Sequence, residues 1–176
     1  ITAAAARHFI DSNNLQDEIN RLLKVLDHND LEELYTTSAS IQKLIINAPL
    51  PADLEELIMD HYLKLCGGNE GVLVSMRSSA IGEDSGNVSF AGQYRTQLNV
   101  SEDMLGHTYK EIVASKYKSQ AIIYRMQRGF RHQDVTMCVG CLVMVDGAVS
   151  GVMYSRSPAD PRSEWAIINA APGLAS

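Results

Sequence analysis

Residues 72–100 constrain the fold of this 176-residue chain more than any other stretch. Residues 72–74 form a short apolar run that follows three glycines, and a run punctuated in this way is typical of a buried strand. Residues 94–100 carry Tyr, Thr, Leu and Val at alternate positions, with polar residues between them, which predicts a second strand. A loop rich in small residues joins the two strands, and Arg77 lies where the first strand leads into that loop.

The loop between these two strands has the chemistry of an anion site. Its glycines, among them Gly92, allow backbone N–H groups to approach an anion closely. The guanidinium of Arg77 is a permanent cation with a planar set of donors that suits phosphate. The pattern predicts a polyphosphate cradle, although it contains neither a P-loop motif nor the G-x-G-x-x-G dinucleotide motif. The alternative is a structural ion pair between Arg77 and Glu83 or Asp84.

Composition indicates a folded chain and excludes several kinds of partner. An apolar fraction of 45% is enough for a core, and 20% charged residues argue against disorder. The formal charge of −6 provides no footprint for a nucleic acid. No apolar run approaches the roughly 18 residues of a membrane helix, and the first residues lack a signal-peptide pattern. We therefore expect a cytoplasmic protein with neither nucleic-acid nor membrane partners.

The three cysteines do not predict a metal site. Cys138 and Cys141 have the C-x-x-C spacing, but positions i and i+3 of a strand point to opposite faces. No second pair is present to complete a zinc site. We interpret these cysteines as small core residues of a protein in a reducing compartment.

Helical periodicity dominates the first part of the chain. Apolar stripes predict four helices within residues 1–66, with Thr2 as the N-cap of the first and Gly67 as the terminator of the fourth. Two more helices are predicted, one starting after Ser101 and one over residues 119–128. The second carries Arg125 on the side that we expect to be a solvated basic face.

The last third of the chain predicts strands. Residues 136–145 and 148–155 are apolar runs joined by Asp-Gly, a strong hairpin signal that would place Val145 opposite Ala148. Both faces of this hairpin would be apolar, which favours burial in a central sheet. Residues 165–170 predict one more strand. The fold class expected is α/β (α+β), with a helical N-terminal part and a mixed or antiparallel sheet.

At this point the chain resembles a known family. Residues 77–84 read RSSAIGED and residues 89–93 read SFAGQ, which closely resembles the R-S-S-A-x-x-E-D…S-F-A-G-Q signature. That signature belongs to the N-terminal ATP-binding domain of the phosphoenolpyruvate synthase and pyruvate phosphate dikinase family. Residues 120–125, 149–154 and 170–174 resemble further segments of the same domain.

The resemblance implies an incomplete ATP-grasp-like fold in which ATP lies between two lobes. Residues 1–70 would be the helical part of the first lobe, and residues 71–176 the α/β nucleotide-binding part. Arg77 would contact the phosphates, and Met144 and Val145 would form the hinge beside adenine. The resemblance implies an ATP-binding set of seven residues: Arg77, Gly92, Gln93, Thr96, Val143, Met144 and Val145.

The resemblance also implies a reaction. Family members are transferases (kinases) that convert ATP to AMP, pass one phosphoryl group through a histidine on a separate domain, and use Mg²⁺. In phosphoenolpyruvate synthases pyruvate accepts that group and water takes the other phosphate. Alternatives are a related enzyme, such as a rifampin phosphotransferase or a glucan, water dikinase, and a non-catalytic ATP-binding module.

The chain departs from the family pattern in several places. The family's N-terminal lysine motif would precede Ile1, its acidic metal ligands would follow Ser176, and Leu142 or Val143 stands where a Gln is usual. We therefore expect a fragment that supplies about half of a nucleotide site, with no catalytic residue and no metal ligand of its own, and with weak ATP affinity when isolated.

Overall fold

The computed structural model describes residues 1–27, 30–80, 95–132, 134–157, 159–160, 162 and 164–174. The chain forms two compact units, an N-terminal unit (Ile1–Met144) and a C-terminal unit (Val145–Ser176). Within the described ranges, no helix combines the length and the apolar character needed to cross a bilayer.

Four helices open the N-terminal unit, as predicted. They are α1 (Ala3–Ser12), α2 (Leu15–Val25), α3 (Leu31–Asn47) and α4 (Ala52–Leu65). The side chain of Thr2 accepts a hydrogen bond from the N–H of Ala5, which confirms its role as the cap of α1. Asp30 caps α3 in the same way, by accepting from two backbone N–H groups of the first turn.

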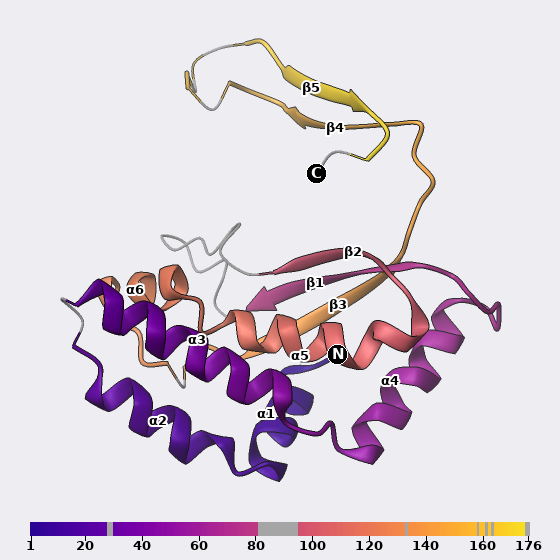
Figure 1. Cartoon of the computed structure of the whole chain (residues 1–176). Helices are drawn as coiled ribbons and strands as arrows, with labels where there is room; N and C mark the ends of the chain where they lie inside the picture. The colour runs from indigo at the N-terminus through magenta and orange to yellow at the C-terminus, as the bar shows by residue number, and fades with distance from the viewer. Residues whose placement is uncertain are drawn as a thin grey trace. The chain divides into compact units, whose positions relative to one another are not determined.

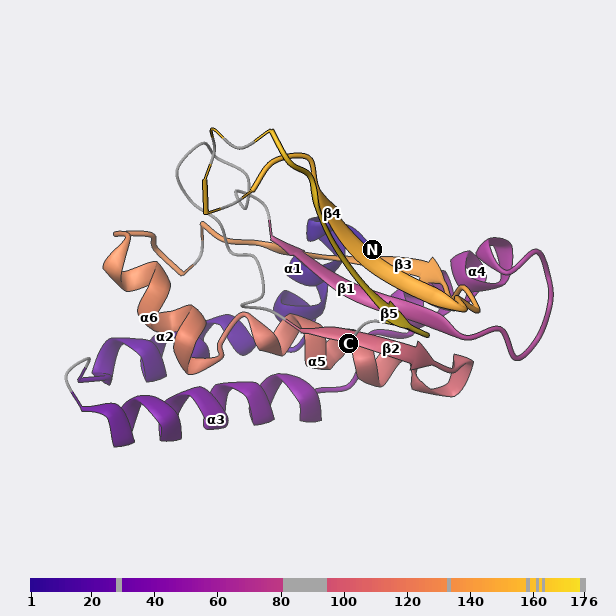
Figure 2. The ribbon, with the colours of Figure 1, turned by 90° about the horizontal axis from the view of Figure 1, so that it is seen from above.

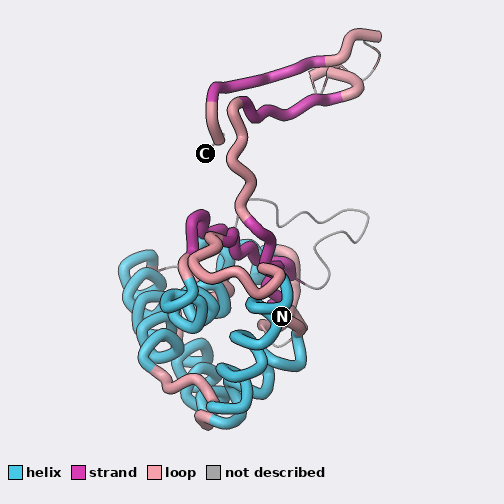
Figure 3. Tube along the Cα trace, turned by 90° about the vertical axis from the view of Figure 1, so that its right-hand side faces the viewer, coloured by secondary structure: helices cyan, strands magenta, loops and turns pink. Residues whose placement is uncertain are grey.

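A three-stranded antiparallel sheet, called sheet A here, lies on one side of these helices (Figures 1 and 3). Strand β1 (Val74–Ala80) is central, with β2 (Thr96–Val100) on one edge and β3 (Met137–Val143) on the other, as Figure 2 shows. The first strand therefore begins later than the apolar run suggested and carries Arg77 inside it. Beyond β3, Ile1 exchanges two backbone hydrogen bonds with Val139, at 2.7 and 2.9 Å.

Helix α5 (Leu105–Ser115) follows a short 3₁₀ helix, η1 (Glu102–Met104), and packs against both sheet A and α3. Helix α6 (Ser119–Gln127) completes the helical layer. The core between the helices and the sheet contains fully buried apolar side chains from both: Phe9, Ile19, Leu34, Ile41, Ile45, Met76, Tyr109, Ile112, Ile122 and Met137. The helices thus cover one face of sheet A.

The predicted hairpin between residues 136–145 and 148–155 is wrong. Strand β3 pairs with β1, while β4 (Val149–Tyr154) pairs with β5 (Ile167–Pro172) in the C-terminal unit. The edge of β3 that the hairpin would have required is occupied by Ile1 instead. At the Asp-Gly dipeptide, the N–H of Gly147 bonds to the carbonyl of Val145, and no two-residue hairpin turn forms.

The C-terminal unit is a two-stranded antiparallel ribbon. Strand β4 pairs with β5 and is not a strand of sheet A, so the expected place of β4 in a central sheet beside β3 is also wrong. The two strands approach closely at Gly151, where a Cβ atom would overlap the carbonyl oxygen of Asn169 and lie 3.1 Å from the Cα of Ala170.

Two further expectations about single residues have clear outcomes. Cys138 pairs with Ser79 and Cys141 with Met76, so the two cysteines occupy alternating positions of β3, which confirms that they face opposite ways. Arg125 was expected on a solvated face but is 0% exposed, and its Nε donates to Nδ1 of His132 at 3.0 Å. Helical periodicity could not show that the loop after α6 brings His132 onto Arg125.

Candidate functional site

The face of sheet A away from the helices brings together three residues of interest. In β1, Arg77 pairs with Thr96 of β2 on one side and with Gly140 of β3 on the other. All three residues are exposed, whereas Val74 and Met76 of the same strand are buried against the helices. The alternation of the strand therefore points Arg77 away from the core. We call this surface the open face.

The positive charge of Arg77 is available to a ligand. Within the described part of the chain, no carboxylate forms an ion pair with its guanidinium. The alternative partners, Glu83 and Asp84, lie outside the described residues. An exposed guanidinium with free N–H donors suits a phosphate or another oxyanion.

Gly140 keeps the surface beside Arg77 open. A Cβ atom at this position would be 3.8 Å from the carbonyl oxygen of Arg77 and 3.9 Å from Cδ1 of Leu142, which is ordinary contact. The described protein atoms would therefore tolerate a side chain at this position. Because Gly140 has none, space remains above the strand beside Arg77. Sequence reasoning missed this residue, although an isolated glycine inside a strand pattern signals the close approach of another group.

The start of β2 is anchored to the helical layer. The N–H of Ser78 donates to the carbonyl of Arg95 at 3.2 Å, and the N–H of Arg95 donates to Oγ of Ser115 in α5 at 3.3 Å. The guanidinium of Arg95 forms an ion pair with Glu111 of α5 at 3.1 Å. These bonds fix Arg95, the residue before Thr96, against β1 and α5. They therefore hold Thr96 in position beside Arg77.

The structure describes only some of the other predicted site residues. Gly92 and Gln93 belong to the connection between β1 and β2 and lie outside the described residues. Val143 is 39% exposed and lies about 10 Å along β3 from Gly140. It pairs with Val74, so its side chain is on the opposite face of sheet A from Arg77.

The last two predicted residues lie at the boundary of the two units. The N–H of Met144 donates to the carbonyl of Leu73 at 2.9 Å and extends the ladder between β1 and β3 by one bond. Val145 belongs to the C-terminal unit and is 72% exposed. The predicted hinge thus coincides with the point where the N-terminal unit ends.

The part of the chain that the structure describes holds no cluster of metal-ligating side chains. Across the described ranges, no three His, Cys, Asp or Glu side chains are close enough to hold one. The expected Mg²⁺ therefore has no carboxylate cage among the described residues.

Comparison with known proteins identifies relatives over the whole chain. Residues 1–176 match the family described as the pyruvate phosphate dikinase AMP/ATP-binding domain. A probable phosphoenolpyruvate synthase from Methanocaldococcus jannaschii is 39% identical over 178 residues, which cover 99% of this chain and 15% of that protein. The phosphoenolpyruvate synthase of Aquifex aeolicus is 40% identical over 180 residues, 99% of this chain and 21% of that protein.

A third relative comes from Escherichia coli strain K12. Its phosphoenolpyruvate synthase is 35% identical over 176 residues, which cover 98% of this chain and 22% of that protein. The chain thus spans about a fifth of the length of these curated relatives.

Proposed function

The chain belongs to the pyruvate phosphate dikinase AMP/ATP-binding domain family, and from this premise we propose that its open face binds the triphosphate of ATP. Arg77 contacts the phosphate oxygens, and the hydroxyl of its partner Thr96 donates a further hydrogen bond. The observation that carries the proposal is the exposed guanidinium of Arg77, which no described carboxylate neutralises.

The physical argument concerns what an anion gains on this face. A charge-assisted hydrogen bond from a guanidinium contributes about 1.5–3 kcal/mol, which is more than a hydrogen bond between neutral groups. The space above Gly140 allows a phosphate to approach without displacing a side chain. The anchored start of β2 keeps Thr96 beside Arg77, so little conformational entropy is lost on binding.

The finer arrangement that we propose is ATP-grasp-like. Residues 1–70 form the helical part of the first lobe, and residues 71–176 form the α/β nucleotide-binding part. Gly92 and Gln93 of the β1–β2 connection cover the phosphates. Val143, Met144 and Val145 form the hinge that lies beside adenine. An extended apolar segment suits a purine, because its side chains contact the flat faces of the ring.

We further propose that the protein carrying this chain is a phosphoenolpyruvate synthase, which converts ATP, pyruvate and water into phosphoenolpyruvate, AMP and phosphate. The support is that the relatives named above are phosphoenolpyruvate synthases and match nearly all of this chain. This chain contributes nucleotide binding. The phosphoryl-carrying histidine, the pyruvate site and the ligands of Mg²⁺ are provided by other parts of such an enzyme.

The test is ATP binding to the full chain and to Arg77→Ala, measured by titration calorimetry. Loss of about 1.5–3 kcal/mol weakens ATP binding by roughly 10- to 150-fold. Arg21→Ala is the matched control, because Arg21 is an exposed arginine of α2 whose described ion pair is with Glu18. Equal ATP affinity in the native chain and in Arg77→Ala would place the triphosphate elsewhere.

A further inference from the structure

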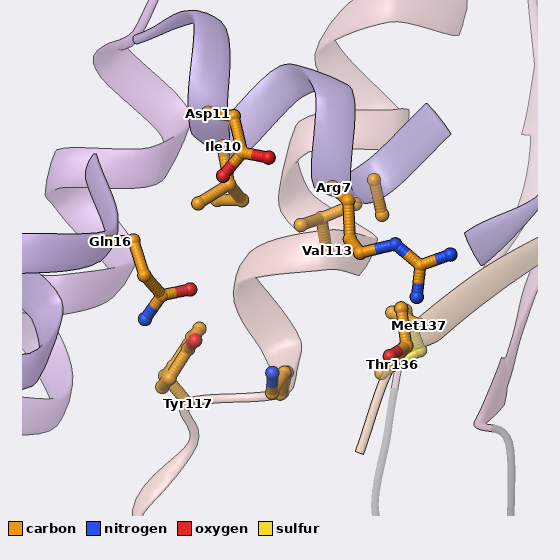
Figure 4. A pocket seen from close by; sticks show the side chains of 10 residues that line it. Arg7, Ile10, Asp11, Gln16, Val113, Tyr117, Thr136 and Met137 are labelled. Atoms are coloured by element: carbon orange, nitrogen blue, oxygen red, sulfur yellow. The ribbon is translucent and has the colours of Figure 1, made fainter. Parts of the chain in front are cut away.

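A pocket with several polar and charged side chains lies on the helical side of sheet A, away from the open face. It has a volume of about 190 Å³ and is lined by α1, the start of α2, the end of α5 and the segment that leads into β3. In Figure 4, Asp11 and Gln16 extend toward it from one side, while Arg7 and Thr136 lie near one another at the other. We call it the α1–α5 pocket. Sequence reasoning assigned no role to these residues.

Two cations, Arg7 and Lys116, line this pocket. Within the described ranges, neither Arg7 nor Lys116 forms an ion pair. The amine of Lys116 is half-buried and lies 5.2 Å from the centre of the Tyr117 ring. A cation–π contact of this kind does not replace the hydrogen bonds that an ammonium makes with water.

The groups around Lys116 determine its charge and the net charge of the pocket. Its pKa is lowered to about 7, first by burial and then by the charge of Arg125 in α6. Arg7 and Asp11 of α1 also line the pocket, and their charges offset one another. The residues that line the pocket are therefore close to neutral together when Lys116 is deprotonated and carry one net positive charge when it is protonated, and Arg125 adds a positive charge nearby.

We propose that the α1–α5 pocket binds a small oxyanion of the sulfate, phosphate or carboxylate type between Arg7 and Lys116. The anion supplies the negative charge and the acceptor oxygens that the lysine lacks, and Gln16 and Thr136 offer further hydrogen bonds. The volume fits such an anion and is too small for a nucleotide, since sites for larger ligands measure roughly 300–1,000 Å³. This site is separate from the nucleotide site proposed above, because it lies on the other side of sheet A.

Binding to this pocket takes up a proton. The anion is attracted to the protonated form of Lys116, so its affinity falls as pH rises above the pKa of about 7. Between about pH 6 and about pH 8 the affinity falls about tenfold, because the protonated fraction of an amine with this pKa falls by that factor. This pH dependence distinguishes the pocket from a site made of permanent cations.

The experiment measures sulfate and acetate binding to the full chain by titration calorimetry at both pH values, with chloride at equal ionic strength. Neither probe changes its own charge in this range, so a pH dependence reports on the protein. We expect binding that is about tenfold tighter at the lower pH. The tighter of the two probes identifies whether the natural anion is tetrahedral or a carboxylate. Absence of binding by both probes, or equal affinity at the two pH values, overturns the proposal.

Matched variants locate the bound anion. Lys116→Met removes binding, Lys116→Arg retains it but abolishes the pH dependence, and Asp11→Asn strengthens it by removing a repelling charge. Lys43→Met, at an exposed position of α3, leaves it unchanged. If Lys116→Met does not fold, Arg7→Met at an exposed position of α1 takes its place and also removes binding.

Arg77→Ala separates this proposal from the nucleotide site. We expect it to weaken ATP binding while leaving sulfate or acetate binding unchanged. If sulfate or acetate binding is lost in Arg77→Ala and retained in Lys116→Met, the anion occupies the open face and the pocket proposal is wrong.

Discussion

Arg77 and Thr96 are antiparallel partners across β1 and β2, although 18 residues separate them in the chain. Both are exposed on the face of sheet A that the helices leave uncovered. Directly paired residues have Cβ atoms about 4.5–5.5 Å apart, so a guanidinium and a hydroxyl at these positions can reach the same anion.

This pairing predicts that the two residues act together on ATP. Thr96→Val removes the hydroxyl with little change in shape and weakens ATP binding by about 0.5–1.5 kcal/mol, or roughly 2- to 13-fold. In a double-mutant cycle with Arg77→Ala, the two effects are not additive, because both residues contact one phosphate. Titration calorimetry of the four proteins measures the coupling, and strict additivity would mean that the residues contact different groups.

Gly140 provides a steric test of the same surface. Gly140→Val should fold normally, because a Cβ atom here makes only ordinary contacts and a β-branched residue is favoured in a strand. The new side chain occupies the space beside Arg77 and should reduce ATP affinity at least tenfold. Unfolding and ATP titrations measure the two effects separately. Unchanged ATP affinity in a stable Gly140→Val protein would argue that the phosphates avoid this part of the face.

Lys116 should make the stability of the chain depend on pH. Its pKa of about 7 in the folded state lies below the ordinary value of 10.5, so between these values the unfolded chain binds more protons. The free energy of unfolding therefore rises with pH across this range, by at most about 1.4 kcal/mol per pH unit from this residue. Below about pH 7 the destabilising effect is fully present.

Lys116→Met tests this linkage. Relative to the native chain, it should raise the free energy of unfolding at neutral pH and flatten its dependence on pH between about 7 and 10. Denaturant unfolding at a series of pH values, without sulfate or phosphate in the buffer, provides the comparison. If the free energy of unfolding depends on pH in the same way in the native chain and in Lys116→Met, the pKa of Lys116 is not lowered.

Gly151 should be essential to the ribbon of the C-terminal unit. Gly151→Ala places a Cβ atom against the carbonyl oxygen of Asn169, and two backbones cannot move apart without breaking the β4–β5 ladder. Amide hydrogen exchange should show loss of protection in both strands and no change in sheet A. Gly147→Ala is the control, because its nearest neighbours would be 3.7 Å or more from the new atom. Equal protection in the two variants would refute the close approach.

Tyr109 offers a test of core polarity. Its ring packs against Phe9, with centroids 6.2 Å apart, and its buried hydroxyl has no hydrogen-bond partner among the described residues. Burial also raises the pKa of Tyr109. Tyr109→Phe keeps the ring and removes the unsatisfied group, so it should raise the free energy of unfolding by about 1 kcal/mol. Phe9→Ala, which leaves a cavity, should lower it by about 3–5 kcal/mol. A loss of stability in Tyr109→Phe would reveal a partner for the hydroxyl.

The helices were predictable because their signals are local. Thr2 caps α1 through a bond to a residue three positions away, and the apolar stripes of α1 to α4 depend on spacings of three or four residues. The same locality explains the recognition of the family from residues 77–93, since a signature is a contiguous pattern.

Strand pairing was predicted poorly because it depends on distant segments. The Asp-Gly dipeptide before Ala148 is a strong local turn signal, yet β3 pairs with β1 and Ile1 occupies its other edge. Nothing within residues 136–155 reveals that the backbone groups of β3 bond to β1 on one edge and to Ile1 on the other. The burial of Arg125 was missed for a different reason, because helical periodicity does not show how the loop after α6 folds back and brings His132 to Arg125.

The amino-acid sequence alone determined the helical layer, the class of fold and the family, because capping, periodicity and contiguous motifs act over a few residues. Only the tertiary structure decided which residues share a surface: Arg77 with Thr96 and Gly140 on the open face, and Arg7 with Lys116 in the α1–α5 pocket. The physical reason is that strand register and helix packing are set by contacts between segments far apart in the chain. The same contacts decide which charged side chains are buried and which stay exposed to solvent.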